Sequence, residues 1–127
     1  VHQYNTFTSF GPAQYGFAAM IRDEPEHHLE LGAFYQAKRD RFREQLLGTR
    51  LKPLPVPGGY FQLVDYSAVS DLSDAEFVKW LTIEHGVTAI PLSPFYETPP
   101  AGQRLARLCF AKNEATLDAA IARLKAL

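Results

Sequence analysis

The sequence predicts an α/β fold, a two-layer sandwich in which helices cover one face of a small sheet. Two observations predict it. Segments with apolar residues every three or four positions alternate along the chain with short runs of aromatic and β-branched residues. The chain has 127 residues, 46% of them hydrophobic and 21% charged, which suits one domain with a core of its own. Helices packed on one side of a small sheet bury the apolar stripes of the helices against the apolar face of the strands.

Composition also excludes several classes of partner. The formal net charge is −1, so no nucleic-acid partner is expected. No apolar stretch approaches the roughly 20 residues of a membrane span, so no membrane association is expected. The single cysteine, Cys109, makes no disulfide framework, which predicts a reducing, cytoplasmic setting. Because the first residue is Val1 and not Met, we expect this chain to be part of a longer one.

The first third of the chain predicts an irregular lead-in and two helices. Residues 1–10 are aromatic and polar without a clear period. Gly11-Pro12 favours a helix start, because proline tolerates the first turn, and this helix continues to about Arg22. A longer helix is predicted from about Glu26 to Leu47, ended by Gly48. Its apolar stripe comprises Leu31, Tyr35, Phe42 and Leu46.

A turn and a strand follow. The stretch PLPVPGG, residues 53–59, is typical of turns, and Pro57 at the second position with Gly58 at the third predicts a type II turn. The next run, YFQLVDY at residues 60–66, is rich in aromatic and branched side chains and predicts a strand.

The third helix has clear signals at both ends. Ser73 and Glu76 have the spacing of a capping box, which predicts a helix start, and Gly86 predicts its end. The residues expected on its buried face are Phe77, Trp80 and Leu81.

The last third predicts two strands and a final helix. Residues 87–96, VTAIPLSPFY, indicate a short strand that enters a proline-bearing loop, and residues 97–103 an exposed connection. The apolar run of residues 105–111 predicts a buried strand, and Asn113 predicts the cap of the last helix. The apolar positions of that helix are Leu117, Ile121, Leu124 and Leu127.

Arg107 lies in the middle of the predicted strand at 105–111, where a charge needs a partner. Two interpretations are open. Arg107 can form a structural ion pair, or extend its head to water along an apolar stem. Alternatively, its planar fork of donors, held on a rigid strand, can bind the carboxylate of a small ligand through two parallel hydrogen bonds.

Other chemistries lack their motifs. His27 and His28 are adjacent, so they point in different directions on a helix, and no HxxxH or CxxC spacing predicts a metal site. Cys109 has no base in view and is not expected to act as a nucleophile. The sequence contains no GxGxxG, Walker or GxSxG motif.

Three stretches carry a family resemblance in their order along the chain: PGGYFQLVDYS, EHGVTAIPLSPFY and ARLCFAKNEATLDAAIARL. They resemble the fold-type I, class I/II pyridoxal-phosphate aminotransferases, in the group of kynurenine and methionine aminotransferases. The first two resemble small-domain strands of that family, and the third resembles its C-terminal signature. VHQYNTFTSFGPAQYGFAAM is similar to the segment that follows the lysine region of the family. The resemblance covers the whole chain. It implies a lead-in and helix, residues 1–24, that join the large domain, and a small C-terminal domain, residues 25–127.

The resemblance also implies roles for individual residues. Arg107 falls on the arginine that binds the α-carboxylate of the substrate. Phe7 and Thr8 fall where one subunit of a homodimer extends side chains into the active site of its partner. Phe95 falls on a loop that closes over the substrate. Because the family packs its lead-in on other surfaces, we expect Tyr4, Phe7 and Phe10 to leave apolar area exposed in this chain alone.

The family's Schiff-base lysine stretch and Gly-Trp-Lys element are absent, as are its other cofactor-binding residues, and the five lysines of this chain lie in other contexts. Transamination needs that lysine, so we expect no catalytic residue, no cofactor and no activity in this chain alone. The parent enzyme is expected to use pyridoxal phosphate and to transfer an amino group from a large neutral amino acid, such as methionine, glutamine or kynurenine, to a keto acid. The alternative is a self-standing, non-catalytic α/β module for ligand binding or dimerisation.

Overall fold

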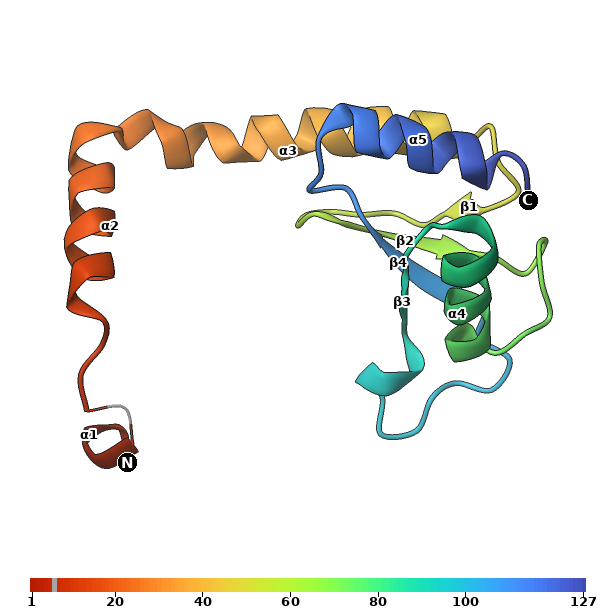
Figure 1. Cartoon of the computed structure of the whole chain (residues 1–127), viewed down its shortest axis with the longest axis horizontal. Coiled ribbons are helices and arrows are strands. Elements are labelled where there is room, and N and C mark those ends of the chain that lie inside the picture. Colours follow the sequence, from red (N-terminus) through yellow and green to blue (C-terminus); the bar gives the residue numbers. More distant parts are fainter. Residues whose placement is uncertain (6) are drawn as a thin grey trace. The chain divides into compact units, whose positions relative to one another are not determined.

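The structure is a computed structural model that describes residues 1–5 and 7–127 (Figure 1). The chain divides into two compact units, residues 1–34 and 35–127, and each is described by itself. The division lies within the long helix α3 (Pro25–Leu46). The predicted boundary between residues 24 and 25 concerns the domains of a parent enzyme and stays a prediction.

The first unit is helical. It contains α1 (His2–Asn5), α2 (Gly11–Asp23) and the first part of α3. Helix α2 starts with Pro12 in its first turn, as predicted, and none of its residues is buried. The short helix α1 was not predicted. Exposed side chains in the lead-in include Tyr4, Phe7 and Phe10, at 89%, 85% and 73% of full exposure, which confirms the expected exposure of apolar area.

The second unit is built on an antiparallel sheet of four strands. They are β1 (Lys52–Pro53), β2 (Phe61–Asp65), β3 (Ile90–Pro91) and β4 (Leu105–Cys109), in the spatial order β1-β2-β4-β3. Strand β4 is therefore central, between β2 and β3. The predicted α/β class is confirmed, and β2, β3 and β4 occur where the sequence predicts strands. Strand β1 was not predicted, because its residues adjoin and enter the segment expected to form a turn.

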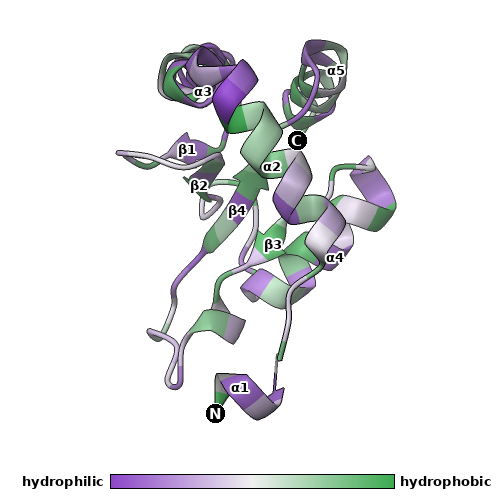
Figure 2. Ribbon diagram, turned by 90° about the vertical axis from the view of Figure 1, so that its left-hand side faces the viewer, coloured by the Kyte–Doolittle hydropathy of each residue, from purple (hydrophilic) through white to green (hydrophobic). Residues whose placement is uncertain are grey.

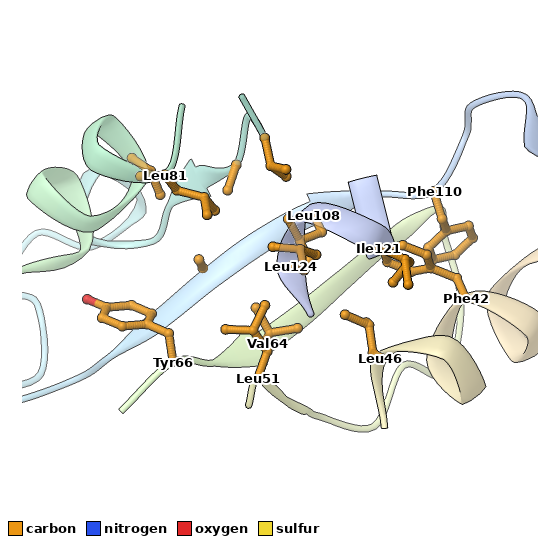
Figure 3. Close-up of a cluster of buried hydrophobic side chains, with 14 of the residues drawn as sticks. Phe42, Leu46, Leu51, Val64, Tyr66, Leu81, Leu108, Phe110, Ile121 and Leu124 are labelled. Atoms are coloured by element: carbon orange, nitrogen blue, oxygen red, sulfur yellow. The ribbon is translucent and has the colours of Figure 1, made fainter. Parts of the chain in front are cut away.

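Helices cover one face of this sheet. Successive side chains of a strand point to opposite faces, so the buried residues of β2 and β4 alternate with less buried ones. Val64, Ala106 and Leu108 are buried on the covered face, and they pack with Phe42 and Leu46 of α3 (Figure 3). Helix α5 (Glu114–Leu124) adds Leu117, Ile121 and Leu124. It carries hydrophobic and hydrophilic residues together, as an amphipathic helix does (Figure 2). Helix α4 (Asp74–His85) adds Phe77 and Leu81 to the same core.

The centre of the core near α4 contains a buried tyrosine. The ring of Tyr66 stacks on Phe77, with the centroids 3.8 Å apart, and its hydroxyl donates a hydrogen bond to the carbonyl of Leu72 at 3.0 Å. Burial, with a smaller contribution from the charge of Asp74, raises the pKa of Tyr66 to about 12.

The predicted caps of α4 and α5 are present. The Ser73 side chain accepts from the N–H of Glu76, and the Glu76 carboxylate accepts from the N–H of Ser73, so the capping box is confirmed. Gly86 ends α4 in the left-handed region, at φ 63°. Asn113 caps α5 by accepting from the N–H of Thr116 at 2.8 Å.

Two predictions of detail are wrong. The positive φ of the turn before β2 lies at Gly59 and not at Gly58, so the type II turn with Gly58 at its third position does not form. The apolar stripe of α3 is buried only in its second half: Phe42 and Leu46 belong to the core, whereas Leu31 is 39% exposed. None of the described helices combines the length and the apolar content needed to cross a membrane.

Candidate functional site

Arg107 lies at the centre of the sheet. In the register of the strands it is opposite Leu63 of β2 on one side and Ile90 of β3 on the other. Its neighbours in sequence, Ala106 and Leu108, are buried against the helices. Because side chains alternate along a strand, the Arg107 side chain leaves the sheet on the opposite face. Two flanking strands therefore fix the base of this side chain.

Two aromatic rings flank the Arg107 guanidinium. Its central carbon lies 4.0 Å from the ring centroid of Phe61 and 4.9 Å from that of Phe95. Phe61 of β2 pairs with Cys109 of β4, two residues after Arg107. Phe61 is therefore a diagonal neighbour of Arg107 on the same face of the sheet. Phe95 ends the short 3₁₀ helix η1 (Ser93–Phe95), which follows β3. Contacts over the plane of a guanidinium stabilise its charge and leave its N–H donors, which point along the plane, for a ligand.

Arg107 has no carboxylate partner among residues 1–5 and 7–127. The ion pairs there involve other arginines: Arg22, Arg39, Arg41 and Arg104. The Nε atom of Arg107 is buried and has no hydrogen-bond acceptor within the described chain. A buried donor without an acceptor costs about 1–3 kcal/mol. The structural ion pair is therefore not formed within the described part of the chain.

The turn that carries Phe95 is held by a buried acid. Asp74, the first residue of α4, is 8% exposed, and its Oδ2 accepts from the backbone N–H groups of Leu92 at 2.7 Å and Ser93 at 2.6 Å. Its Oδ1 accepts from the N–H of Ala75 at 2.9 Å. Burial by itself raises the pKa of Asp74, but the hydrogen bonds from Ser93, Leu92 and Ala75 outweigh it and hold the pKa below its ordinary value. The Asp74 side chain is therefore ionised at neutral pH.

The Phe61 side of the site is supported by the hairpin before β2. Arg43 of α3 donates to the carbonyl of Leu54 at 2.5 Å, and the buried amide of Gln62 donates to the same carbonyl at 2.8 Å. The Tyr60 and Phe61 rings lie 4.6 Å apart between centroids. These contacts fix the entry to β2 and with it the base of Phe61.

The structure brings together two of the four residues that the resemblance indicates, Arg107 and Phe95. Phe7 and Thr8 lie in the unit of residues 1–34, so their roles in the active site of a partner subunit stay predictions. Phe7 is exposed and has a positive φ of 54°, which is uncommon for a residue with a side chain. Thr8 is exposed, and its hydroxyl donates to the carbonyl of Ser9 at 3.2 Å.

Metal ligation finds no support in this part of the molecule. Within residues 1–5 and 7–127, no three side chains of His, Cys, Asp or Glu gather where they could hold an ion. Cys109 is half-buried and reduced.

The sequence did not reveal Phe61 and Asp74. Phe61 belongs to a predicted strand, but its neighbourhood with Arg107 depends on the register between strands far apart in the chain. Asp74 follows the helix cap Ser73, and acids are common in the first turn of a helix, so the sequence pattern indicated no further role for it. The sequence signal for Phe61 was limited to alternation, which places it on the same face as Leu63, two residues later. That this face is the one of Arg107 became clear only from the pairing of Leu63 with Arg107.

Comparison with known proteins identifies the family. Residues 3–124 match the family described as "Aminotransferase class I and II". This chain belongs to the class I and II aminotransferases. It is 57% identical to a methionine aminotransferase of Escherichia coli over 127 residues, which is all of this chain and 33% of that protein. It is 36% identical to kynurenine–oxoglutarate transaminase 3 of Mus musculus over 94% of this chain and 30% of that aminotransferase.

Solved aminotransferase structures share the fold. One from Escherichia coli, reported as a methionine aminotransferase, has a TM-score of 0.93 at 57% identity and covers 100% of this chain and 33% of its own. N-succinyldiaminopimelate aminotransferase from Mycobacterium tuberculosis has a TM-score of 0.87 at 30% identity and covers 98% of this chain and 32% of its own. The chain therefore matches part of a fold-type I aminotransferase, and it spans about a third of the length of the curated relatives it matches.

Proposed function

We propose that this chain is the substrate-carboxylate clamp of a pyridoxal-phosphate-dependent aminotransferase that transfers an amino group from a large neutral amino acid to a keto acid. One observation carries the proposal: the Arg107 guanidinium contacts the rings of Phe61 and Phe95 and has no acid partner in the described chain. The similarity to aminotransferases named for methionine and kynurenine supports a large neutral amino acid as the amino donor, such as methionine, glutamine or kynurenine.

In this proposal Arg107 binds the substrate and does not react with it. The two terminal nitrogens of its guanidinium donate parallel hydrogen bonds to the α-carboxylate, which fixes both the position and the rotation of the substrate. The central place of Arg107 in the sheet keeps this orientation constant, and correct orientation lowers the barrier of the later steps. Phe95, whose ring lies 4.9 Å from the guanidinium carbon, excludes water from the ion pair and so strengthens it.

The family implies pyridoxal phosphate for the parent enzyme, where it supplies the electron sink of transamination. The described residues do not fit a site for it. The buried acid Asp74 is already occupied by three backbone N–H groups, and Asp118 by Arg41 and Gln45, so neither is placed to serve the pyridine nitrogen. Lys38 donates to the carbonyl of Lys112 at 2.7 Å. We therefore place no catalytic residue and no cofactor in this chain, and we propose that it is inactive alone.

The proposal extends to assembly and location. Phe7 and Thr8, in the exposed lead-in, are proposed to reach the active site of the second subunit in a homodimer of the parent enzyme. The exposed aromatic side chains around them provide the apolar surface that such a contact would bury. The partners are then amino acid and keto acid substrates, without nucleic acid or membrane, in the cytoplasm.

Steady-state kinetics of the full-length protein test this function. Methionine, glutamine and kynurenine serve as amino donors, with a 2-oxo acid as acceptor. We expect Arg107→Ala to lower kcat/KM by at least about a hundredfold, because a charge-assisted, bidentate pair is lost. Arg107→Lys should recover only part, because a point charge cannot present the fork.

Arg104→Ala is the matched control, since Arg104 lies just before β4 and pairs with the exposed Asp71 at 2.9 Å. It should change kcat/KM less than threefold. Normal kinetics of Arg107→Ala would refute the clamp. Absence of transamination with any amino acid would favour the alternative, a non-catalytic ligand-binding or dimerisation module.

A further inference from the structure

We propose that Asp74 is a positioning residue of the candidate site, because its buried carboxylate fixes the turn that places Phe95 over the Arg107 guanidinium. This inference rests on the proposed function, in which Arg107 and Phe95 contact the substrate. Asp74 itself contacts neither side chain through any hydrogen bond or ion pair of the described residues.

The contact of Asp74 with the turn is made by one oxygen and two consecutive N–H groups. Oδ2 accepts from Leu92 at 2.7 Å and from Ser93 at 2.6 Å, where the chain passes from β3 into η1. Two donors from adjacent residues fix both the position and the direction of the backbone at that point. Short bonds to an ionised acceptor are stronger than bonds between neutral groups. The turn is thus fastened to the first residue of α4.

The path from this point to Phe95 is short and hydrogen-bonded. The N–H of Phe95 donates to the carbonyl of Leu92 at 3.0 Å, and the N–H of Tyr96 donates to that of Ser93 at 3.1 Å. Leu92 and Ser93 therefore each bond to Asp74 through the N–H and to the end of η1 through the carbonyl. A displacement of either residue is passed to the backbone of Phe95.

The ring of Phe95 depends on its backbone because its own packing is sparse. Phe95 is 62% exposed, whereas Leu92, which begins the turn, is only 8% exposed. The contact of a partly exposed ring with a cation is weak, so it cannot by itself hold a loose turn in place. The position of Phe95 over Arg107 thus follows from the anchored turn.

The charge at position 74 is also explained by this role. A buried carboxylate is costly unless its oxygens are satisfied, and here three N–H groups satisfy them: those of Ala75, Leu92 and Ser93. An asparagine has one acceptor oxygen, and its NH₂ group would oppose one of these donors. The start of α4 also favours a negative charge.

Amide hydrogen exchange of this chain, followed by NMR, tests the anchor directly. In the unaltered chain the amides of Leu92 and Ser93 should exchange at least tenfold more slowly than those of the exposed Glu97 and Thr98. Asp74→Asn should accelerate amide exchange at Leu92 and Ser93 at least tenfold. It should also weaken the nuclear Overhauser effects between the Phe95 ring and the Arg107 side chain.

Asp71→Asn is the matched control, because Asp71 is an acid of the same segment that is exposed and bonds only to Arg104 among the described ion pairs. It should leave both readouts within twofold of the unaltered chain. Unprotected amides at Leu92 and Ser93 in the unaltered chain would overturn the proposal without any variant. Unchanged exchange in a folded Asp74→Asn variant would overturn it as well.

A double-mutant cycle in the full-length enzyme then tests positioning against mere stability. Asp74→Asn and Phe95→Leu should each raise KM for the amino acid several-fold. The double variant should match Phe95→Leu alone, because Asp74 acts through that ring. Additive effects would overturn the positioning role. If Arg107→Ala leaves KM unchanged, the proposed function fails, and the exchange experiment still decides whether Asp74 holds the turn.

Discussion

The guanidinium carbon of Arg107 lies 4.0 Å from the ring centroid of Phe61, its diagonal neighbour on the adjacent strand. The two residues leave the same face of the sheet, and the main-chain ladder between β2 and β4 fixes their separation. The ring supports one side of a cation whose Nε is buried without an acceptor. Phe61 is thus part of the site although it is not placed to bond a ligand carboxylate itself.

Replacement of Phe61 should weaken substrate binding. Phe61→Leu keeps an apolar side chain but removes the ring face, so we expect KM for the amino acid in the full-length enzyme to rise about three- to tenfold. Phe61→Tyr keeps the ring and should leave KM within twofold. If Phe61→Leu has the kinetics of the unaltered enzyme, the ring does not support the guanidinium.

Replacement of Arg107 should cost little folding stability. Because Arg107 has no internal ion pair in the described chain, Arg107→Met should change the free energy of unfolding by less than about 1 kcal/mol, measured by urea denaturation. Breaking a buried structural pair would cost about 3–5 kcal/mol. A loss of that size would return Arg107 to a structural role.

Gly86→Ala should destabilise the chain by about 1–2 kcal/mol. Gly86 has φ 63°, and a Cβ there would lie 2.6 Å from Nη1 of Arg123, which donates to the Gly86 carbonyl. Gly58→Ala is the control, since Gly58 lacks a positive φ and has nothing within 4 Å of an added Cβ. Thermal melts of the two variants should differ accordingly. Equal melting temperatures would contradict the strain at Gly86.

Stability should fall at high pH because of Tyr66. Its pKa is about 12 in the folded chain, above the ordinary 10, so its contribution is fully present below pH 10. That contribution, on the order of 2 kcal/mol, is lost as the pH rises from 10 towards 12. Tyr66→Phe should remove this part of the pH dependence in urea unfolding curves. An unchanged slope between pH 10 and 11.5 would show that another group is responsible.

Pyridoxal phosphate should not bind this chain specifically. With no lysine in a Schiff-base context, the chain should show only slow, unsaturable labelling and no red-shifted absorbance band at stoichiometric cofactor. The full-length protein is the positive control. Saturable, one-to-one binding by this chain would contradict the assignment of the cofactor site to the rest of a parent enzyme.

Features that depend on neighbours in sequence could be predicted. The capping box of Ser73 and Glu76, the end of α4 at Gly86 and the cap of α5 at Asn113 each depend on residues within one helical turn. Which glycine of a consecutive pair takes the positive φ could not be predicted from local preference, and the prediction chose Gly58 in place of Gly59. Both glycines tolerate that conformation, so local preference does not distinguish them.

The composition of the site was harder to predict, because it joins distant segments. Arg107 stood out as a charge in an apolar run, and the resemblance indicated Phe95. Phe61 depends on the register of β2 with β4, which no local pattern specifies. Asp74 bonds to residues 18 and 19 positions away, and its place after a helix cap offered a sufficient local explanation. Such long-range hydrogen bonds leave no periodic signal.

The order of the strands has a kinetic consequence. Strand β4, the last of these four strands to emerge during synthesis, inserts between β2 and β3, so two of the three ladders of the sheet close only after most of the unit has been made. Pairings between distant segments lose much chain entropy before they gain contacts, and they form slowly. The β2 edge remains unpaired until then and can join another nascent chain. Deletions that remove β4 should therefore give aggregates in place of a soluble intermediate.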